Sequence, residues 1–351
     1  MKLKIDFGNL TFLVLTILFL PANLISAESL ENDDDPWTFS FYFENDLFAN
    51  TDGNYTNGTK FSWISPDLSE YREVGKLPAA VNRAIQFLPY IHKEGMQRNI
   101  TLSFGQNIYT PDDIQRTTLD PNDRPYAGWL YFGIGYQTKS DRWLNIIEVN
   151  FGIVGPWALG EEAQNFVHET RDIPTAKGWV NQLKNEPALN IVWERRYRSV
   201  FFGQDGGLGL DGFIHYGASL GNVFTYANAG LGLRFGWNLP ADFGASTIRL
   251  AGDTNAPSSR EDLRNRKDKL VSFHLFFGVD GRGVLRDLTL DGNTFRDSHS
   301  VDREPWVADF IGGLAFVVGD WKISYSQVRR TKTFEGSRDH SFGSINISFS
   351  Y

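Results

Sequence analysis

The sequence of 351 residues contains no cysteine and only two methionines. Without cysteine, the chain has no disulfide framework, no thiol nucleophile and no thiolate ligand for a metal. Long apolar runs are also missing after residue 20, and none approaches the roughly 20 apolar residues that a membrane-spanning helix needs. We therefore expect packing and strand pairing to stabilise the fold, and we expect no membrane-spanning helix.

The first 27 residues have the features of an export signal. Lys2 and Lys4 precede an apolar run at residues 10–20, and the small residues Ser26 and Ala27 come just before Glu28. This arrangement predicts a signal peptide at 1–27 and a mature domain at 28–351. The formal net charge of -8 argues against nucleic acid as a partner. Nothing in the sequence indicates an obligate protein partner.

Glycine and aromatic residues are abundant, with 34 Gly, 28 Phe, 13 Tyr and 10 Trp, although no long apolar block follows the signal peptide. Barrels of the outer membrane have this composition, because lipid-facing residues alternate with polar lumen-facing ones and aromatics gather at the interfaces. The composition predicts an all-β protein, an antiparallel transmembrane β-barrel located in the cell outer membrane.

Segments in which apolar and polar residues alternate recur along the whole chain, and about twelve can be counted. They are 37–47, 55–65, 98–109, 125–138, 143–155, 188–201, 206–219, 227–238, 268–281, 304–318, 320–333 and 341–351. Lengths near ten residues suit tilted membrane strands, and an even number suits a closed barrel. The last segment ends on aromatic Tyr351, which resembles the closing strand of such barrels, although a soluble edge strand would alternate in the same way.

Strand parity places several connections at the same end of the predicted barrel. If both termini lie on the periplasmic side, the connections 48–54, 110–124 and 156–187 share the outer rim. The opposite end would then carry two long connections, 66–97 and 239–267, where short turns are usual. The second of these is rich in charge, and we expect it to be mobile.

The connection 156–187 contains a candidate catalytic helix at residues 158–170. Glu161, Gln164, Asn165 and His168 are spaced at i, i+3, i+4 and i+7, and therefore share one helix face. A polar stripe of this kind also suits a face that contacts water. An imidazole is nevertheless the side chain best suited to take a proton from water near neutral pH, so His168 is the candidate base of a hydrolase.

A second candidate cluster lies where the first predicted strand ends. Asn45 and Asp46 are poor strand formers at the tip of strand 37–47, and Thr56 begins the returning strand. An ordinary hairpin turn would use the same residue types. For both Asn45 and Asp46 to reach one site, the strand must end, twist or bulge between them. On a regular strand, Glu44 points to the face opposite to that of Asn45, and the sequence indicates no partner for it there.

Several short motifs resemble, in order, the lipid A 3'-O-deacylase family of outer-membrane barrels. They are Glu44-Asn45-Asp46, Tyr55-Thr56-Asn57-Gly58, Gln106-Asn-Ile-Tyr109-Thr-Pro111, Asp123-Arg124-Pro-Tyr126, Gly155-Pro156, Gln164-Asn165-x-x-His168 and Gly178-Trp179-x-x-Gln182. The match runs from the first to the sixth predicted strand and is diffuse afterwards. The resemblance implies a twelve-stranded barrel that depends on Ca²⁺ and hydrolyses the 3'-linked acyloxyacyl group of lipid A in the outer leaflet.

The resemblance also implies roles for individual residues. His168 matches the general base, and Gln164 matches the amide one helical turn before it. Asn45, Asp46 and Thr56 match the polar groups that bind the cation and the oxyanion, with Asp46 as the metal ligand.

Two further positions follow less directly from the resemblance. Arg116 stands where a basic residue would meet a lipid A phosphate, although a solvated loop charge is the equal alternative. Pro174 occupies the place of the family's acidic group after the histidine, which leaves Glu169 or Asp172 as candidates for a second carboxylate.

Two other functions are consistent with the same sequence. One is a small outer-membrane channel or structural barrel without enzymatic activity, although the interior side chains of a barrel of this size would largely fill its lumen. The other is an outer-membrane phospholipase, which would use the same base and a different lipid.

Overall fold

The computed structural model describes residues 36–49, 54–68, 94–170, 172–203, 207–244, 247–249, 252–258, 262–264 and 271–351. The predicted signal peptide at 1–27 lies outside these residues, and the predicted mature domain is described from residue 36 onward. All described residues fall within one unit, Asp35–Tyr351.

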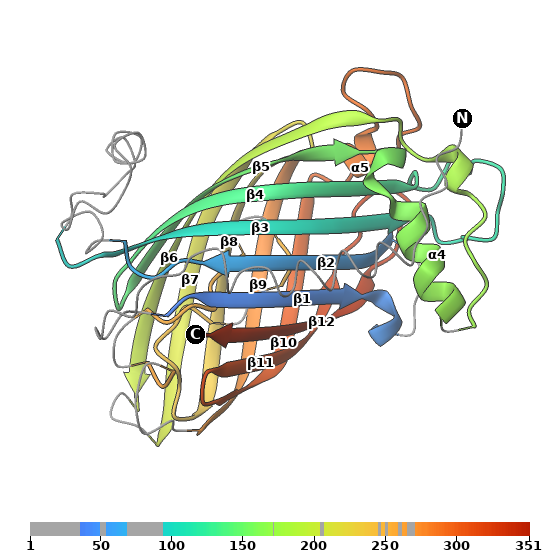
Figure 1. The fold of residues 1–351 in the computed structure, drawn as a ribbon. Helices are drawn as coiled ribbons and strands as arrows, with labels where there is room; N and C mark the ends of the chain where they lie inside the picture. The colour runs from blue at the N-terminus through green and yellow to red at the C-terminus, as the bar shows by residue number, and fades with distance from the viewer. Residues whose placement is uncertain are drawn as a thin grey trace. The chain divides into compact units, whose positions relative to one another are not determined.

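Twelve strands pair with their sequence neighbours in antiparallel order, and β1 pairs with β12 to close a barrel (Figure 1). The strands are β1 (Thr38–Asn45), β2 (Asn54–Ile64), β3 (Gln97–Thr110), β4 (Ala127–Lys139), β5 (Trp143–Val154), β6 (Glu186–Phe202), β7 (Leu208–Gly221), β8 (Phe224–Trp237), β9 (Val271–Asp287), β10 (Trp306–Val318), β11 (Trp321–Arg330) and β12 (His340–Ser350). Every predicted strand is present, so the predicted twelve-stranded barrel is confirmed.

The period-two pattern sorts side chains between the lumen and the outer surface. On β6, Ala188, Asn190 and Val192 are buried, whereas the alternating residues Leu189 and Ile191 are about half exposed. Because the sheet is closed, one face of every strand looks into the lumen and the other looks outward. Polar residues therefore line the lumen, whereas the apolar residues of the same strands face outward.

Short helices lie in the connections. They are η1 (Asp46–Ala49), η2 (Pro156–Ala158), α4 (Gly160–Thr170), η3 (Trp179–Asn181) and α5 (Leu288–Asp291). The predicted helix at 158–170 corresponds to α4, which begins at Gly160 because η2 ends in left-handed Leu159 (φ 57°). Within the described part of the chain, no helix has the length and apolarity required to cross a membrane.

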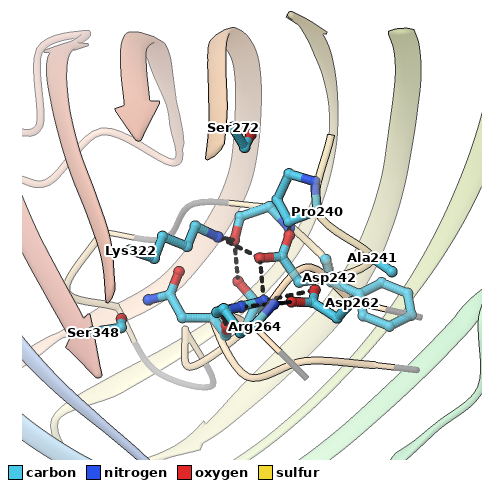
Figure 2. A network of polar contacts seen from close by, with 12 residues as sticks. Pro240, Ala241, Asp242, Asp262, Arg264, Ser272, Lys322 and Ser348 are labelled. Atoms are coloured by element: carbon cyan, nitrogen blue, oxygen red, sulfur yellow. Dashed lines mark hydrogen bonds and ion pairs between the residues drawn. The ribbon is translucent and has the colours of Figure 1, made fainter. Parts of the chain in front are cut away.

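The charged connection between β8 and β9 was expected to be mobile, but the parts of it that the structure describes are largely buried. Its described parts, 239–244, 247–249, 252–258 and 262–264, are largely buried inside the barrel, and we call them the lumen segment. Figure 2 shows the charged side chains of this segment surrounded by strands. Charge in the sequence suggested solvation, but the polar lumen supplies buried partners for these charges instead.

Asp242 is the centre of this lumen network. Its carboxylate accepts hydrogen bonds from Lys322 Nζ at 2.6 Å and from Arg264 Nη2 at 3.0 Å (Figure 2). It also accepts from Arg234 Nη1 at 2.6 Å. Arg234 belongs to β8 and Lys322 to β11, so the network joins the lumen segment to two separate strands of the wall. Asp262 also pairs with Arg264, at 2.8 Å.

Candidate active site

Connections that are far apart in sequence meet at one end of the barrel. Asn54 Nδ2 donates to Asp112 Oδ1 at 2.8 Å, and Gln115 Nε2 donates to the carbonyl oxygen of Thr175 at 3.0 Å. These contacts join the connections that follow β1, β3 and β5, as strand parity predicted. Helix α4 stands at this end (Figure 1).

A β-bulge decides which way Thr56 points. The register between β2 and β3 shifts between Tyr55 and Asn57, so Thr56 is an extra residue without a partner in the strand ladder. Tyr55 consequently faces the lumen, where its hydroxyl donates to Glu44 Oε2 at 2.9 Å. Thr56 faces outward, and its Oγ1 lies 2.7 Å from Thr110 Oγ1 on β3.

The strand break expected between Asn45 and Asp46 is present. β1 ends at Asn45, and the 3-10 helix η1 begins at Asp46. Both side chains are buried, with 4% and 1% of their surface exposed. The two residues are therefore no longer constrained to opposite faces, which removes the geometric objection to their sharing a site.

Helix α4 packs against the outer surface of the barrel wall. Gln106, an outward-facing residue of β3, donates from Nε2 to the carbonyl oxygen of Ala158 at 2.6 Å, just before the helix. Ile108 of β3 packs in a cluster with Trp179 and with Ala163 of α4. Since Ile108 and Thr110 share the outward face of β3 with Gln106, the helix covers the same side of the wall to which Thr56 points.

The buried face of α4 is polar, and its large apolar residue is exposed. Gln164 and His168 are each 2% exposed, whereas Phe166 is 58% exposed. The predicted stripe is thus only partly buried, because Glu161 is exposed at one end. Asn165 is half-buried, and its Oδ1 accepts from the backbone N–H of Ala176 at 3.2 Å.

The backbone carbonyl of Pro174 orients His168. Its oxygen lies 2.8 Å from His168 Nδ1. A carbonyl oxygen accepts and never donates, so Nδ1 carries the proton and Nε2 of the neutral ring is left as the basic nitrogen. The two carboxylates considered for this role from the sequence, Glu169 and Asp172, are both exposed. At this position a main-chain carbonyl orients the ring.

A tryptophan orients Gln164. The indole Nε1 of Trp179 donates to Gln164 Oε1 at 2.8 Å, and both residues are buried. This bond fixes the amide so that its NH₂ group points away from the indole. Gln164 Nε2 is buried and has no hydrogen-bond partner among the described residues. A buried donor without a partner is costly, which identifies it as a group that can serve a ligand.

Arg116 lies apart from these buried groups. It is part of the connection between β3 and β4, forms an ion pair with Asp120, and is about two-fifths exposed. Its Nε also donates to Thr118 Oγ1 at 3.2 Å. The guanidinium is therefore presented at the surface of the rim, where a phosphate could reach it.

The donors near η1 are oxygen atoms. Asp46 supplies a carboxylate, while Asn45 and Thr56 supply an amide oxygen and a hydroxyl. No group of three or more His, Cys, Asp or Glu residues within the described ranges is arranged to hold a metal ion. Calcium also takes amide and main-chain carbonyl oxygens and water, so the types of donor present fit Ca²⁺, with a single side-chain carboxylate.

A serine nucleophile was set aside at the level of sequence because no Gly-x-Ser-x-Gly elbow was recognised, yet Gly217-Ala-Ser219-Leu-Gly221 has that pattern. The structure excludes the elbow, because these residues lie within β7 and not on a strand-to-helix turn. Ser219 Oγ instead donates to the carbonyl oxygen of Phe224 at 2.9 Å.

The family model described as "Outer membrane protein LpxR" matches residues 10–351. The chain belongs to this LpxR family. It is accordingly an outer-membrane protein, and the predicted location is confirmed. No curated protein matches the sequence.

One solved structure of the same family has the same fold. LpxR from Salmonella typhimurium superimposes with a TM-score of 0.72 at 18% identity, over 90% of this chain and 100% of that chain. The β domain of the Bordetella autotransporter BrkA has a TM-score of 0.38 at 11% identity, with 91% and 99% of the two chains covered. At 18% identity the likeness to the Salmonella LpxR structure shows the fold.

Sequence reasoning missed two contributors to the architecture around the site. Glu44 is fully buried and has partners, because the backbone N–H of Ile248 in the lumen segment donates to Glu44 Oε1 at 2.6 Å. Trp179 belongs to a short motif that gave no indication of its contact with Gln164, yet its indole orients the Gln164 amide. Alternation along β1 indicated the direction of Glu44, whereas no local signal could supply a partner about 200 residues away.

Proposed function

We propose that this LpxR-family protein is an esterase that removes the 3'-linked acyloxyacyl group of lipid A in the outer leaflet. One observation carries the proposal: His168 and Gln164, whose Nε2 has no partner among the described residues, lie on the buried face of α4, over the outer surface of β3. A catalytic site on the outward side of a barrel wall is accessible to a lipid within the membrane plane. Family membership supports the choice of lipid A as the substrate.

His168 acts as the general base in this proposal. Nε2 takes a proton from a water molecule, and the resulting hydroxide attacks the ester carbonyl carbon. The carbonyl of Pro174 stabilises the imidazolium through Nδ1–H. When the tetrahedral intermediate collapses, the same proton passes to the departing 3'-oxygen, so the histidine returns to its neutral state. Such a base contributes roughly a hundred to ten thousand fold to the rate.

Gln164 acts as an oxyanion donor. Its Nε2 has no partner among the described residues, and Trp179 holds it in place, so it is preorganised to meet negative charge that develops on the carbonyl oxygen. Donors of this kind act strongly in a site from which water is excluded, and losing one costs on the order of a hundred to a thousand fold.

Asp46 and Asn45 would hold Ca²⁺, with Thr56 beside them on the outward face of β2. When bound there, the ion supplies positive charge that stabilises the oxyanion. Arg116 binds a lipid A phosphate at the surface of the rim, because a guanidinium pairs well with phosphate oxygens. The substrate is thus held at its phosphate by an exposed residue and at its ester by buried ones.

The direct test is to express the wild-type chain and the His168→Ala variant in a host whose lipid A carries a 3'-acyloxyacyl group. Mass spectrometry of lipid A should show loss of that group with the wild-type chain and no loss with the variant. The matched control is Glu162→Ala, because Glu162 is an exposed residue of the same helix. This variant should behave as the wild type does.

Three results would contradict the proposal. Wild-type protein that leaves lipid A intact would exclude the substrate, and release of fatty acid from labelled phospholipid would identify a phospholipase instead. A His168→Ala variant with full activity would exclude the base. The channel alternative has little structural support, since the lumen segment is buried across the interior of the barrel.

A further inference from the structure

A cavity of about 180 Å³ lies in the lumen, between the barrel wall and the lumen segment. Glycines at inward positions of the wall leave this space open. A Cβ at Gly278 of β9 would meet no side chain within 4 Å, and neither would one at Gly232 of β8. The cavity extends toward the outer rim, where Arg303 and Thr333 line it, and Phe243 of the lumen segment borders its other side.

The barrel wall separates this cavity from the candidate active site. Tyr55 and Tyr109 line the cavity, whereas their neighbours Thr56 and Thr110 face outward beneath α4. The peptide chain of β2 and β3 therefore lies between the two spaces. A ligand in the lumen would not contact His168 or Gln164, so the cavity has no role in the proposed hydrolysis.

Two arginines on one side of the cavity share a single carboxylate. Arg330 donates Nε and Nη2 to Asp309, at 2.7 and 2.8 Å, and Arg282 pairs with the same carboxylate. Arg330 Nη1 has no hydrogen bond to any described residue. The side chains of Arg330 and Arg282 are 18% and 19% exposed, although both belong to inward-facing positions. Their exposed surface is turned to the cavity.

A second pair of arginines borders the same cavity and also shares one carboxylate. Arg249 of the lumen segment and Arg196 of β6 both bind Glu194, and Arg249 uses both of its terminal nitrogens to do so. The third carboxylate of the cluster, Asp280, accepts from His215 at 2.7 Å and lies 3.4 Å from Arg282 Nε. Four guanidinium groups thus face three carboxylates, which leaves a net positive charge when His215 is neutral.

The other charged side chains that border the cavity interact with groups of opposite charge. Arg234 pairs with Asp211 and Asp242, Arg303 with Asp291, and Glu304 with Lys332, while Asp287 is attracted by the buried Arg124 and also accepts from Thr289 at the start of α5. The excess positive charge is therefore confined to the four arginines of the shared pairs.

We propose that this cavity binds a monosaccharide-sized ligand that carries a phosphate or carboxylate group. The open guanidinium N–H donors suit an oxyanion, for which arginine is the preferred side chain. A cavity of about 150 Å³ is known to accept a six-membered ring, so the volume here suits one sugar ring. Phe213 and Phe276 line the same space and give the ring an apolar face. Access comes from the outer rim, because the lumen segment closes the other side.

The test is isothermal titration of the folded mature protein in detergent micelles with four probes: glucose 6-phosphate, glucuronate, glucose and inorganic phosphate. At least one anionic sugar should bind with one-to-one stoichiometry, and at least tenfold more tightly than glucose or inorganic phosphate. Preference between the two anionic sugars decides whether the natural ligand is a sugar phosphate or a sugar acid.

Two glycines of β9 provide matched variants. Gly278→Leu places a side chain in the cavity and should weaken binding at least tenfold, whereas Gly281→Leu, on the outward face of the same strand, should change affinity less than twofold. Arg330→Gln removes an open donor without adding volume and should also weaken binding at least tenfold. This third variant keeps the test informative if Gly278→Leu fails to fold.

The proposal is overturned if neither anionic sugar binds, if glucose or inorganic phosphate binds equally well, or if the Gly278 and Gly281 variants have the same affinity. Lipid A deacylation measured on the Gly278→Leu variant should match the wild type. This readout separates the two proposals, because failure of the deacylase function would leave the binding result unaffected.

Discussion

Asp242→Asn should destabilise the barrel by detaching the lumen segment from its wall. The substitution removes one buried charge and keeps the size of the side chain. Arg234 retains Asp211, to which it donates at 2.9 and 2.6 Å, and Arg264 retains Asp262 at 2.8 Å. Lys322, however, keeps only the carbonyl oxygen of Gly244 at 3.1 Å. One fully buried ammonium group is left without a countercharge.

Removing one partner of a buried ion pair costs roughly 3–5 kcal/mol, because the remaining charge is desolvated and uncompensated. Since two of the three cations keep a carboxylate, we expect a loss of about 3 kcal/mol in the free energy of unfolding. Lys322→Met should cost less, about 1–2 kcal/mol, because Asp242 keeps both arginines. The double variant should be more stable than the sum of the two single effects predicts, by about 2 kcal/mol.

The assay is urea-induced unfolding in lipid vesicles, followed by tryptophan fluorescence. Burial raises the pKa of Asp242, but attraction to Lys322, Arg234 and Arg264 outweighs it and holds the pKa well below the ordinary 3.8. A carboxylate whose pKa is lower in the folded state than in the unfolded state stabilises the fold at any pH above its unfolded-state pKa. This contribution is lost as the pH falls through the folded-state pKa. The difference between wild type and Asp242→Asn should therefore be constant near neutral pH and shrink below about pH 3.8. An unchanged urea midpoint for Asp242→Asn, or additive single effects, would refute the reasoning.

The remaining predictions concern the candidate active site and Arg116 at the rim. Trp179→Phe removes the donor that orients Gln164 and should lower kcat of lipid A deacylation about tenfold; an unchanged kcat would contradict this positioning role. Gly160→Val should lower activity further, because a Cβ at Gly160 would lie 2.7 Å from Trp179 and displace the helix, which protease sensitivity of α4 would report. Chelation of Ca²⁺ should abolish deacylation while leaving the barrel folded, as circular dichroism can check; full activity in chelator would exclude the metal. Arg116→Ala should raise KM with kcat retained, whereas an effect on kcat alone would contradict a phosphate-binding role.

The strands were predictable because their signal is local. In β12, Ile345, Ile347 and Phe349 alternate with small polar residues, and a period of two requires no knowledge of the partner strand. The helix at 158–170 was predictable for a similar reason, since the spacing of Gln164 and His168 places them on one face. In both cases the geometry of a single element determines the pattern.

The burial of the lumen segment was not predictable because it also requires Lys322 of β11, which is 80 residues from Asp242, whereas Arg234 is only 8 residues away. Asp242 and Arg264 have the composition of a solvated loop, and only Lys322 and Arg234 on the wall make their burial favourable. The orientation of Thr56 was also hidden, because a bulge of one residue reverses the alternation that a regular strand would follow.

The sequence by itself determined the strand number, the closed antiparallel order, the rim shared by the odd-numbered connections and the identity of the candidate site residues. These features depend on periodicity, strand parity and short motifs. Each of these signals can be read from the sequence of single segments and from their order along the chain. Only the tertiary structure decided that Thr56, Gln164 and His168 belong to the outer side of the wall, and that a cationic cavity lies on the other side. Side-chain direction across a closed sheet depends on register and bulges, and the burial of charge depends on partners that folding brings from other strands of the wall.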